Sequence, residues 1–252
     1  MSGHSKWATI KHKKGALDAK RGKLFTKLIR ELTIAAKMGG ADVSGNPRLR
    51  AAIADAKGQS MPGDTIKRAV QRGAGELEGV SYDDVLYEGT GPAGTLFLVQ
   101  GVTDNRNRTV AEIRKIFEKN NGVLGGASTA GWAFDRKGLI TLGKESATED
   151  QLMEVAVGAG AEDYSDQGDD WLLSCPTEAM SAVGEALEKA KIAVKSSKIG
   201  YVPKNKKSIS GRDAEVALNL AEALDDHDDV QTVYADFDVS DEEMSRIAAS
   251  SS

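Results

Sequence analysis

Apolar residues recur at helical spacing in the first third of the chain. Within residues 16–38 they fall on one arc of a helix with 3.6 residues per turn: Leu17, Leu24, Phe25, Leu28, Ile29, Leu32, Ala35 and Ala36. The pair Asn46-Pro47 supplies an N-cap and a proline at the first helical position, which predicts a second helix that ends at Gly58. A third helix is expected from Pro62 to Gly73. The pattern therefore predicts a small unit of three helices.

Strands and helices alternate after residue 79. Segments rich in β-branched and aromatic residues and bounded by glycines predict strands, whereas helical spacing of apolar residues predicts a helix. The strands are expected at residues 85–87, 95–102 and 132–134, and the helix at residues 105–120. A helix at 211–224 and a strand at 230–237 are too few for a domain of their own. We expect them to complete the sheet of residues 80–135.

The segment between these parts has the order strand, helix, strand, strand, helix, strand over residues 136–203. That βαββαβ order is typical of the ferredoxin-like unit. The prediction is therefore an α+β protein of three domains. They are a basic arm and helical domain (1–79), a central α/β domain (80–135 plus 204–240) and an inserted ferredoxin-like domain (136–203).

Charge divides the chain into two parts of opposite sign. The first 75 residues carry 16 Lys/Arg against 5 Asp/Glu, whereas the remaining 177 carry 17 against 33. The formal net charge of the whole chain is only −5, which conceals this asymmetry. A basic segment on an acidic protein indicates a polyanionic partner, and nucleic acid is the commonest one.

One face of the first predicted helix carries Lys20, Lys23, Lys27 and Arg30. Like charges at these spacings repel one another and destabilise a helix, so a face that accepts them favours an anionic partner. The remaining candidates for nucleic-acid contact lie in the arm, beside this face, on the other two helices and in the loop before the central helix: His4, Lys6, Trp7, Lys11, His12, Lys13, Lys14, Arg21, Arg48, Arg50, Lys67, Arg68, Arg72, Arg106 and Arg108. In the arm, Trp7 suits base stacking, although a solvated tail fits equally well. Arg106 and Arg108 either contact phosphate or pair with a nearby carboxylate.

Residue patterns typical of catalysis are missing from the sequence. The three histidines share no metal-ligand spacing, and Cys175 has no partner cysteine. Gly89–Gly94 matches G-x-G-x-x-G, but a strand follows it where a dinucleotide site needs a helix. The acidic run at 225–229 is typical of a solvated helix end. We therefore expect a non-enzyme without cofactor or metal, cytoplasmic, without a membrane segment, and a monomer by default.

Six motifs together resemble the YebC family: GHSKWATIKHKK at 3–14, KRGKLFTKLIRELTIAAK at 20–37, NPRLRAAI at 46–53, MPGDTIKRAVQRG at 61–73, YEGTGPAG at 87–94 and TDNRNRT at 103–109. That family includes bacterial proteins described as probable transcriptional regulators and a mitochondrial translational activator of a cytochrome oxidase subunit. The resemblance implies the same three domains, a basic N-terminal motif that binds nucleic acid, and a loop motif at Arg106 and Arg108. Thr90 and Ala93 stand where the family carries an aromatic residue and a glycine.

The resulting hypothesis is a nucleic-acid-binding regulator of gene expression. Charge alone does not separate DNA from ribosomal RNA. Few Asn or Gln residues, which read adenine, accompany the basic residues, so recognition of phosphates and shape is favoured. Such recognition suits structured RNA. The favoured hypothesis is therefore a ribosome-associated translation factor that aids elongation. The alternative within the same class is a DNA-binding transcriptional regulator. Two further alternatives are an adaptor that binds an acidic protein and an enzyme with an unrecognised site in the central domain.

Overall fold

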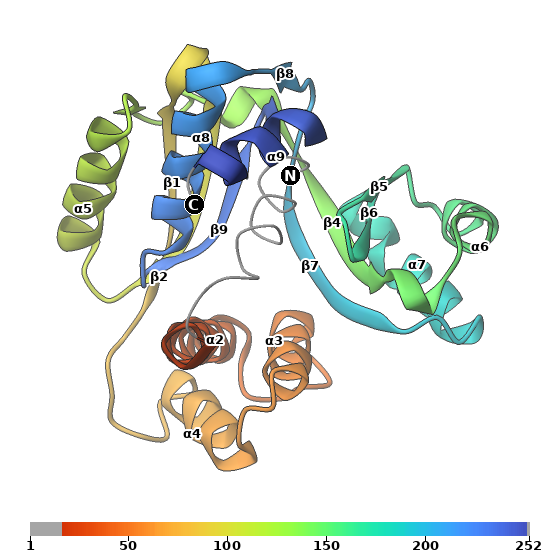
Figure 1. Cartoon of the computed structure of the whole chain (residues 1–252). Helices are drawn as coiled ribbons and strands as arrows, with labels where there is room; N and C mark the ends of the chain where they lie inside the picture. The colour runs from red at the N-terminus through yellow and green to blue at the C-terminus, as the bar shows by residue number, and fades with distance from the viewer. Residues whose placement is uncertain (1–16, 251–252) are drawn as a thin grey trace. The chain divides into compact units, whose positions relative to one another are not determined.

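The computed structural model describes the backbone of residues 17–250 and the side chains of residues 22–249. The chain divides into two compact units. Unit 1 comprises the described residues up to Phe134 together with those from Pro203 onward, and unit 2 is Asp135–Val202. Mixed α/β architecture with helices at the N-terminal end is therefore confirmed (Figure 1). The finer division into three domains stays a prediction.

Unit 1 begins with the three helices that the apolar pattern predicts: α2 (Leu17–Gly39), α3 (Pro47–Gly58) and α4 (Gly63–Gly73). Their shared core contains Leu32, Leu49 and Ile66. The N-cap of α3 explains how two helices are held together. The Asn46 side chain accepts a hydrogen bond from Leu49 N at 3.0 Å and donates to Ala35 O, on α2, at 2.8 Å.

Helix α4 packs tightly against α2 because it ends in glycine. A Cβ atom on Gly73 would lie 2.1 Å from the carbonyl oxygen of Thr33 and 2.8 Å from the Cβ of Ala36. The Thr33 hydroxyl donates to Ile29 O on its own helix, at 2.8 Å. Gly73 therefore serves close helix packing as well as helix termination.

A four-stranded antiparallel sheet follows in the order β3-β1-β2-β9. Its strands are β1 (Asp83–Thr90), β2 (Leu96–Thr103), β3 (Val123–Leu124) and β9 (Val230–Ala235). Helices α5 (Arg106–Lys119) and α8 (Gly211–Asp225) bury their apolar sides with one face of this sheet in a core that includes Phe97, Phe117 and Leu218. The expectation that residues 211–237 complete the sheet of residues 80–135 is confirmed, because β9 pairs with β2.

Unit 2 has the strand and helix order expected for residues 136–203. Its elements are β4 (Phe134–Gly143), α6 (Glu149–Leu152), β5 (Asp163–Asp166), β6 (Asp170–Cys175), α7 (Met180–Lys189) and β7 (Val194–Pro203), and the sheet order is β5-β6-β4-β7 (Figure 1). β4 and β7 each run one residue across the boundary with unit 1. Helix α6 continues as a π-helical turn over Met153–Val157. The unit has its own core, in which Cys175 is a buried free thiol.

Three local predictions were wrong or incomplete. Gly131–Ala133 forms a 3₁₀ turn, and the strand expected at 132–134 begins only at Phe134. A glycine-rich stretch at residues 122–131, for which no strand was predicted, holds a short strand, β3, which pairs with β1. The C-terminal end forms a further helix, α9 (Asp241–Ser250), whose Met244 and Ile247 join the core of unit 1. A short parallel pair of β8 (Lys207–Ser208) and β10 (Phe237–Asp238) precedes α8 and α9, respectively.

Candidate nucleic-acid interface

Part of the predicted interface lies outside the described residues. These are the arm residues His4, Lys6, Trp7, Lys11, His12, Lys13 and Lys14. Lys20 and Arg21 lie on helix α2, but their side chains are not among those described. The remaining ten predicted residues are described in full. Six of them contact the acidic end of α8 or carboxylates elsewhere in unit 1, and four are exposed without a carboxylate partner among the described residues: Arg50, Lys67, Arg68 and Arg72.

The basic face of α2 is held against an acidic turn of the same unit. We define the acidic turn as residues 225–229, which contain four aspartates and His227. Lys23 Nζ donates to Asp226 O at 3.2 Å, and Lys27 Nζ donates to Asp225 O at 2.5 Å. The guanidinium of Arg30 donates to Asp228 O and pairs with Asp229 Oδ1 at 2.7 Å. The anionic partner that the repulsion within this face predicts is therefore present in the chain itself.

The end of α8 explains this attraction. The last carbonyls of a helix lack partners within the helix, and the helix dipole places partial negative charge there. Helix α8 ends at Asp225 without a basic residue in its last turn, and further aspartates follow. Side-chain charge and dipole thus have the same sign. Lys23 and Lys27 of α2 supply the missing positive charge. Burial lowers the pKa of Lys27, although the charges of Asp225, Asp226 and Asp228 partly oppose this effect.

Asp229 joins three elements of unit 1. Its carboxylate pairs with Arg30 of α2, accepts from Thr109 Oγ1 at 2.6 Å and Thr103 Oγ1 at 3.1 Å, and pairs with Arg108 Nη2 at 3.1 Å. Only 2% of the residue is exposed. Burial alone would raise the pKa of this carboxyl, but the hydrogen bonds from Thr109 and Arg108 and the charge of Arg30 outweigh it, so the pKa is lowered. The expectation of a solvated helix end is wrong for Asp229.

A possible metal site beside this carboxylate is already internally bonded. Side-chain ligand atoms of Glu112, His227 and Asp229 all lie within 4.8 Å of one another. However, Asp229 N donates to His227 Nδ1 at 3.1 Å, and His227 Nε2 lies 2.9 Å from Glu112 Oε2. With Nδ1 as acceptor, Nε2 donates to the glutamate, so both ring nitrogens are used. The trio is a hydrogen-bond network.

Three further predicted cations have carboxylate partners. Arg48 binds Glu31 at 2.6 Å and Asp84 at 2.7 Å, and so connects α3 to α2 and β1. Burial lowers the pKa of its guanidinium, but the bonds to the two carboxylates outweigh burial and raise it. Arg106 lies 3.4 Å from Asp83. Arg108 pairs with Asp104 at 2.6 Å as well as with Asp229. The two arginines lie in the first turn of α5 and not in the loop before it, and both show the carboxylate pairing that was one of the two alternatives.

The solvent-facing cations lie on α3 and α4. Exposed side chains there are Arg50, Lys67, Arg68 and Arg72, together with Lys57, which was not predicted from the sequence. Arg50 donates to the backbone oxygens of Val43 and Ser44. Among the described residues, none of the five has a carboxylate partner within 4.0 Å. Arg50 and Lys57 are seven residues apart and share one side of α3, while the three cations of α4 span an arc of about 140°, at about 100° per residue.

Two structural features of unit 1 were not predicted from the sequence. The Glu88 carboxylate accepts from Ala130 N at 2.6 Å and Gly131 N at 2.8 Å, and thereby organises the glycine-rich stretch. Beside it Trp132 is 66% exposed, an aromatic surface of the kind that stacks on bases. The other missed feature is the contact of the acidic turn with α2, since the acidic run was interpreted as a solvated helix end. Its signal was visible as a helix that ends in aspartates without a basic residue.

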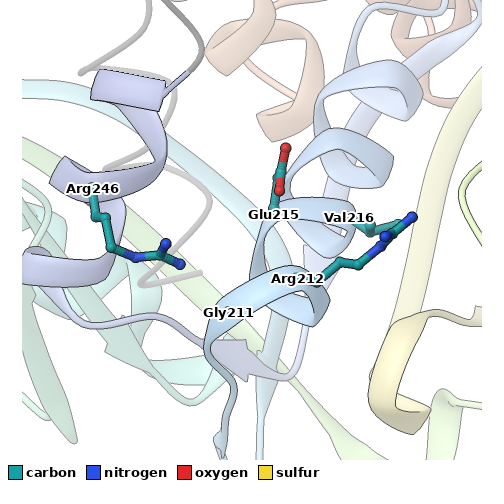
Figure 2. A pocket seen from close by; sticks show the side chains of 5 residues that line it. All are labelled: Gly211, Arg212, Glu215, Val216 and Arg246. Carbon is teal, nitrogen blue, oxygen red and sulfur yellow. The ribbon is translucent and has the colours of Figure 1, made fainter.

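Two hollows are described in unit 1. One, of about 540 Å³, lies between α8 and α9 and is lined by Gly211, Arg212, Glu215, Val216 and Arg246. Figure 2 shows that Arg212 and Arg246 extend from different helices in different directions. Glu243 pairs with Arg246 at 2.7 Å and accepts from Gly211 N at 2.5 Å, and bonding to Arg246 and Gly211 lowers the pKa of Glu243 to about 2. A second hollow, of about 600 Å³, is lined by residues of α2, α4 and the segment 75–82.

Together these observations define a mixed α/β protein whose N-terminal helices are rich in cations. Comparison with known proteins identifies the family. Residues 5–76 match the model of the TACO1/YebC protein N-terminal domain, and residues 82–237 match that of the TACO1/YebC second and third domain. The chain belongs to the TACO1/YebC family, which confirms the resemblance found from the motifs.

Relatives are similar over nearly the whole chain. A probable transcriptional regulatory protein of Geobacter sulfurreducens is 53% identical, over 98% of this chain and 100% of the relative. One of the same description from Koribacter versatilis is 52% identical over the same shares. The crystal structure of a conserved hypothetical protein from Aquifex aeolicus has a TM-score of 0.87 and 41% identity, and covers 93% of this chain and 97% of that one. Within residues 17–250, no helix combines the length and apolar character required to cross a bilayer.

Proposed function

We propose that this protein is a nucleic-acid-binding regulator of gene expression that acts without catalysis, with DNA as its target. The observation that carries the proposal is the set of solvent-facing cations on α3 and α4: Arg50, Lys57, Lys67, Arg68 and Arg72. On α4, the three cations are accompanied by a single acidic residue, Asp64 in the first turn. Such a surface neutralises phosphates and releases their counterions. The names of the relatives, probable transcriptional regulatory proteins, support DNA as the target.

The proposal assigns different weights to the predicted residues. The five exposed cations of α3 and α4 are the primary contacts, together with the arm. Arg48, Arg106 and Arg108 have carboxylate partners and serve chiefly to connect elements of unit 1. Lys23, Lys27 and Arg30 are engaged by the acidic turn in the structure described. The solvent-facing set is thus smaller than the sequence alone indicated.

A triple substitution on α4 tests this assignment. Lys67→Ala, Arg68→Ala and Arg72→Ala together are expected to weaken binding to a fluorescein-labelled DNA duplex of mixed sequence, measured by fluorescence anisotropy over a range of salt concentrations. Removal of each cation that binds a phosphate should flatten the slope of log affinity against log salt by about 0.9. Removal of three such cations should change the slope by about 2.7.

Helix α5 offers a matched control. Arg114, Lys115 and Lys119 are exposed and have the same sequence spacing as the three cations of α4, but Glu112 and Glu118 lie among them. Their replacement by alanine removes the same formal charge and should leave the slope unchanged. Equal slope changes for the two triple variants would show that only net charge matters, and would remove α4 from the interface.

Structured RNA is the second candidate target, which would fit a ribosome-associated translation factor. The exposed positions of α4 hold Lys and Arg, and its one amide side chain, Gln71, is half-buried. Adenine is typically read by Asn or Gln, so this surface suits phosphate and shape recognition. Crosslinking in cells followed by sequencing of the bound nucleic acid separates the targets. Promoter DNA reads support the first candidate, and ribosomal RNA reads support the second.

A further inference from the structure

The contact between α2 and the acidic turn is one in which a phosphate backbone could take the place of the turn. Lys23 and Lys27 donate to the backbone oxygens of Asp226 and Asp225, and the Lys27 ammonium lies 3.9 Å from Asp225 Oδ1. Oxygens that present negative charge to successive turns of a basic helix face resemble a nucleic-acid backbone in charge and in hydrogen-bonding capacity. The acidic turn therefore occupies cations that a phosphate backbone would also bind.

We propose that the acidic turn is an autoinhibitory mimic of a phosphate backbone, which nucleic acid displaces from Lys23 and Lys27. The inference rests on the proposed function and concerns the regulation of the same basic surface. In the closed form, where the acidic turn contacts α2, Lys23 and Lys27 are occupied, whereas the described cations of α3 and α4 remain exposed. Displacement of the turn adds the α2 face to the interface and releases the N-terminal half of α2 from the end of α8.

The contacts of α2 with the acidic turn differ in how deeply their partners are buried. We expect the exposed contacts to open and the buried one to remain. Asp226 and Asp228 are exposed, and the Asp225 side chain is 46% exposed. The Lys27–Asp225 pair at 3.9 Å is the ion pair that these three aspartates form with the described side chains of α2, and a pair with so exposed a carboxylate is weak and screened by salt, so a polyanion competes with it readily. Arg30 and Asp229 are different, with side chains only 13% and 3% exposed. We assign this buried pair the role of a pivot that keeps α2 attached while Lys23 and Lys27 exchange partners.

One feature limits the stability of the closed contact between Lys27 and the acidic turn. Lys27 loses hydration in this contact, which is the main reason that its pKa is lowered. Loss of hydration favours opening when a better anionic partner is available. The measured affinity for nucleic acid is then the intrinsic affinity reduced by the fraction of molecules that are open.

The test weakens the acidic turn without touching a basic residue. Asp225→Asn, Asp226→Asn and Asp228→Asn together keep the backbone oxygens and remove three charges, while Asp229 stays intact. We expect this triple variant to bind a labelled DNA duplex about fivefold more tightly than the unmodified chain, because the negative charges of the three aspartates no longer attract Lys27 in the closed contact. The control is Glu178→Gln, Glu185→Gln and Glu188→Gln in unit 2, which changes the net charge equally at exposed positions. Its affinity should stay within about twofold of the unmodified chain.

Hydrogen exchange of the unmodified chain provides a second measurement that needs no variant. Added duplex should increase amide exchange over residues 225–231 if the turn is displaced. Unchanged or slower exchange there, or equal affinities for the aspartate and glutamate variants, would overturn the proposal while leaving the proposed function intact. If neither the unmodified chain nor the aspartate variant binds DNA or RNA, the proposed function fails and the autoinhibitory role fails with it.

Discussion

Asp229 shows how one buried carboxylate connects distant parts of the sequence. It receives Arg30 from α2, Arg108 and Thr109 from α5, and Thr103 from β2. A buried charge is tolerated only when partners replace its lost hydration, and here four side chains do so. Periodicity identified the elements that contribute these groups. It did not indicate that they meet at one carboxylate, because Asp229 lies more than a hundred residues from each of them.

Asp229→Asn is expected to lower the free energy of unfolding at pH 7 by about 3 kcal/mol, because Arg30 keeps a buried charge without its partner. The pKa of the Asp229 carboxyl is lowered in the folded state, so its stabilising contribution is present above the unfolded value near 4. That contribution is lost as the pH falls through the folded pKa. The difference between the two proteins should therefore shrink in acid, as measured by urea unfolding at several pH values.

Asp228→Asn serves as the control for this prediction. Asp228 is exposed, and its contact with Arg30 uses the backbone oxygen, which the substitution keeps. Its effect should stay within about 0.5 kcal/mol at all pH values. A loss for Asp229→Asn that is no larger than this, or one that does not depend on pH, would contradict the role of Asp229 as a charged centre.

Ala93 carries a backbone conformation that suits glycine. Its φ angle is +54°, in the left-handed region that costs a residue with a Cβ about 1–2 kcal/mol. The family resemblance placed a glycine at this position, and the structure supplies the physical reason. Ala93→Gly should raise the free energy of unfolding by about 1 kcal/mol, since relief of strain exceeds the entropy added to the unfolded chain. Thermal unfolding is the appropriate measurement.

The sign of the effect distinguishes strain from a general preference for alanine. Ala111 is exposed on helix α5, where glycine is disfavoured. Ala111→Gly should lower the free energy of unfolding by about 1 kcal/mol. Two substitutions of the same chemical type are thus expected to act in opposite directions. Destabilisation by both would show that Ala93 is not strained.

Among the elements, those with long and regular apolar patterns were predictable. The helices at 16–38, 46–58 and 62–73 were found because each has several apolar residues on one side and a cap or glycine at its ends. Helix α9 was missed because its buried side consists mainly of Met244 and Ile247, too few for periodicity to indicate a helix. β3 was missed because its two residues lie in a glycine-rich stretch and pair only through register with β1.

Helix α2 shows both the value and the limit of local reasoning about charge. Repulsion between Lys23, Lys27 and Arg30 predicts an anionic partner, expected from the sequence to be nucleic acid. The partner turned out to include carboxylates and carbonyls about 200 residues further along the chain. Nothing in the spacing of α2 identifies that partner, because it depends on how residues 211–235 return to the central sheet. Chain topology, rather than composition, decides which cations remain exposed.

At the scale of the whole molecule, the two units have separate cores. The described core clusters of unit 1 and unit 2 share no residue. β4 and β7 are the strands that continue from one unit into the other. Each core therefore has the means to unfold as a separate cooperative unit. Whether the two units unfold separately determines whether a substitution in unit 2 affects the exposed cations of unit 1.

Leu173→Ala tests this independence. Leu173 is 1% exposed in the core of unit 2, and its truncation should destabilise that unit by about 3 kcal/mol. Hydrogen exchange should then quicken in β5 and β6, while amides of α8 in unit 1 keep their protection. Leu218→Ala, at a fully buried position of α8, should give the reverse pattern. Equal loss of protection in both units from either substitution would mean that the two units unfold together in one cooperative transition. A destabilising substitution in unit 2 would then also unfold the nucleic-acid surface of unit 1.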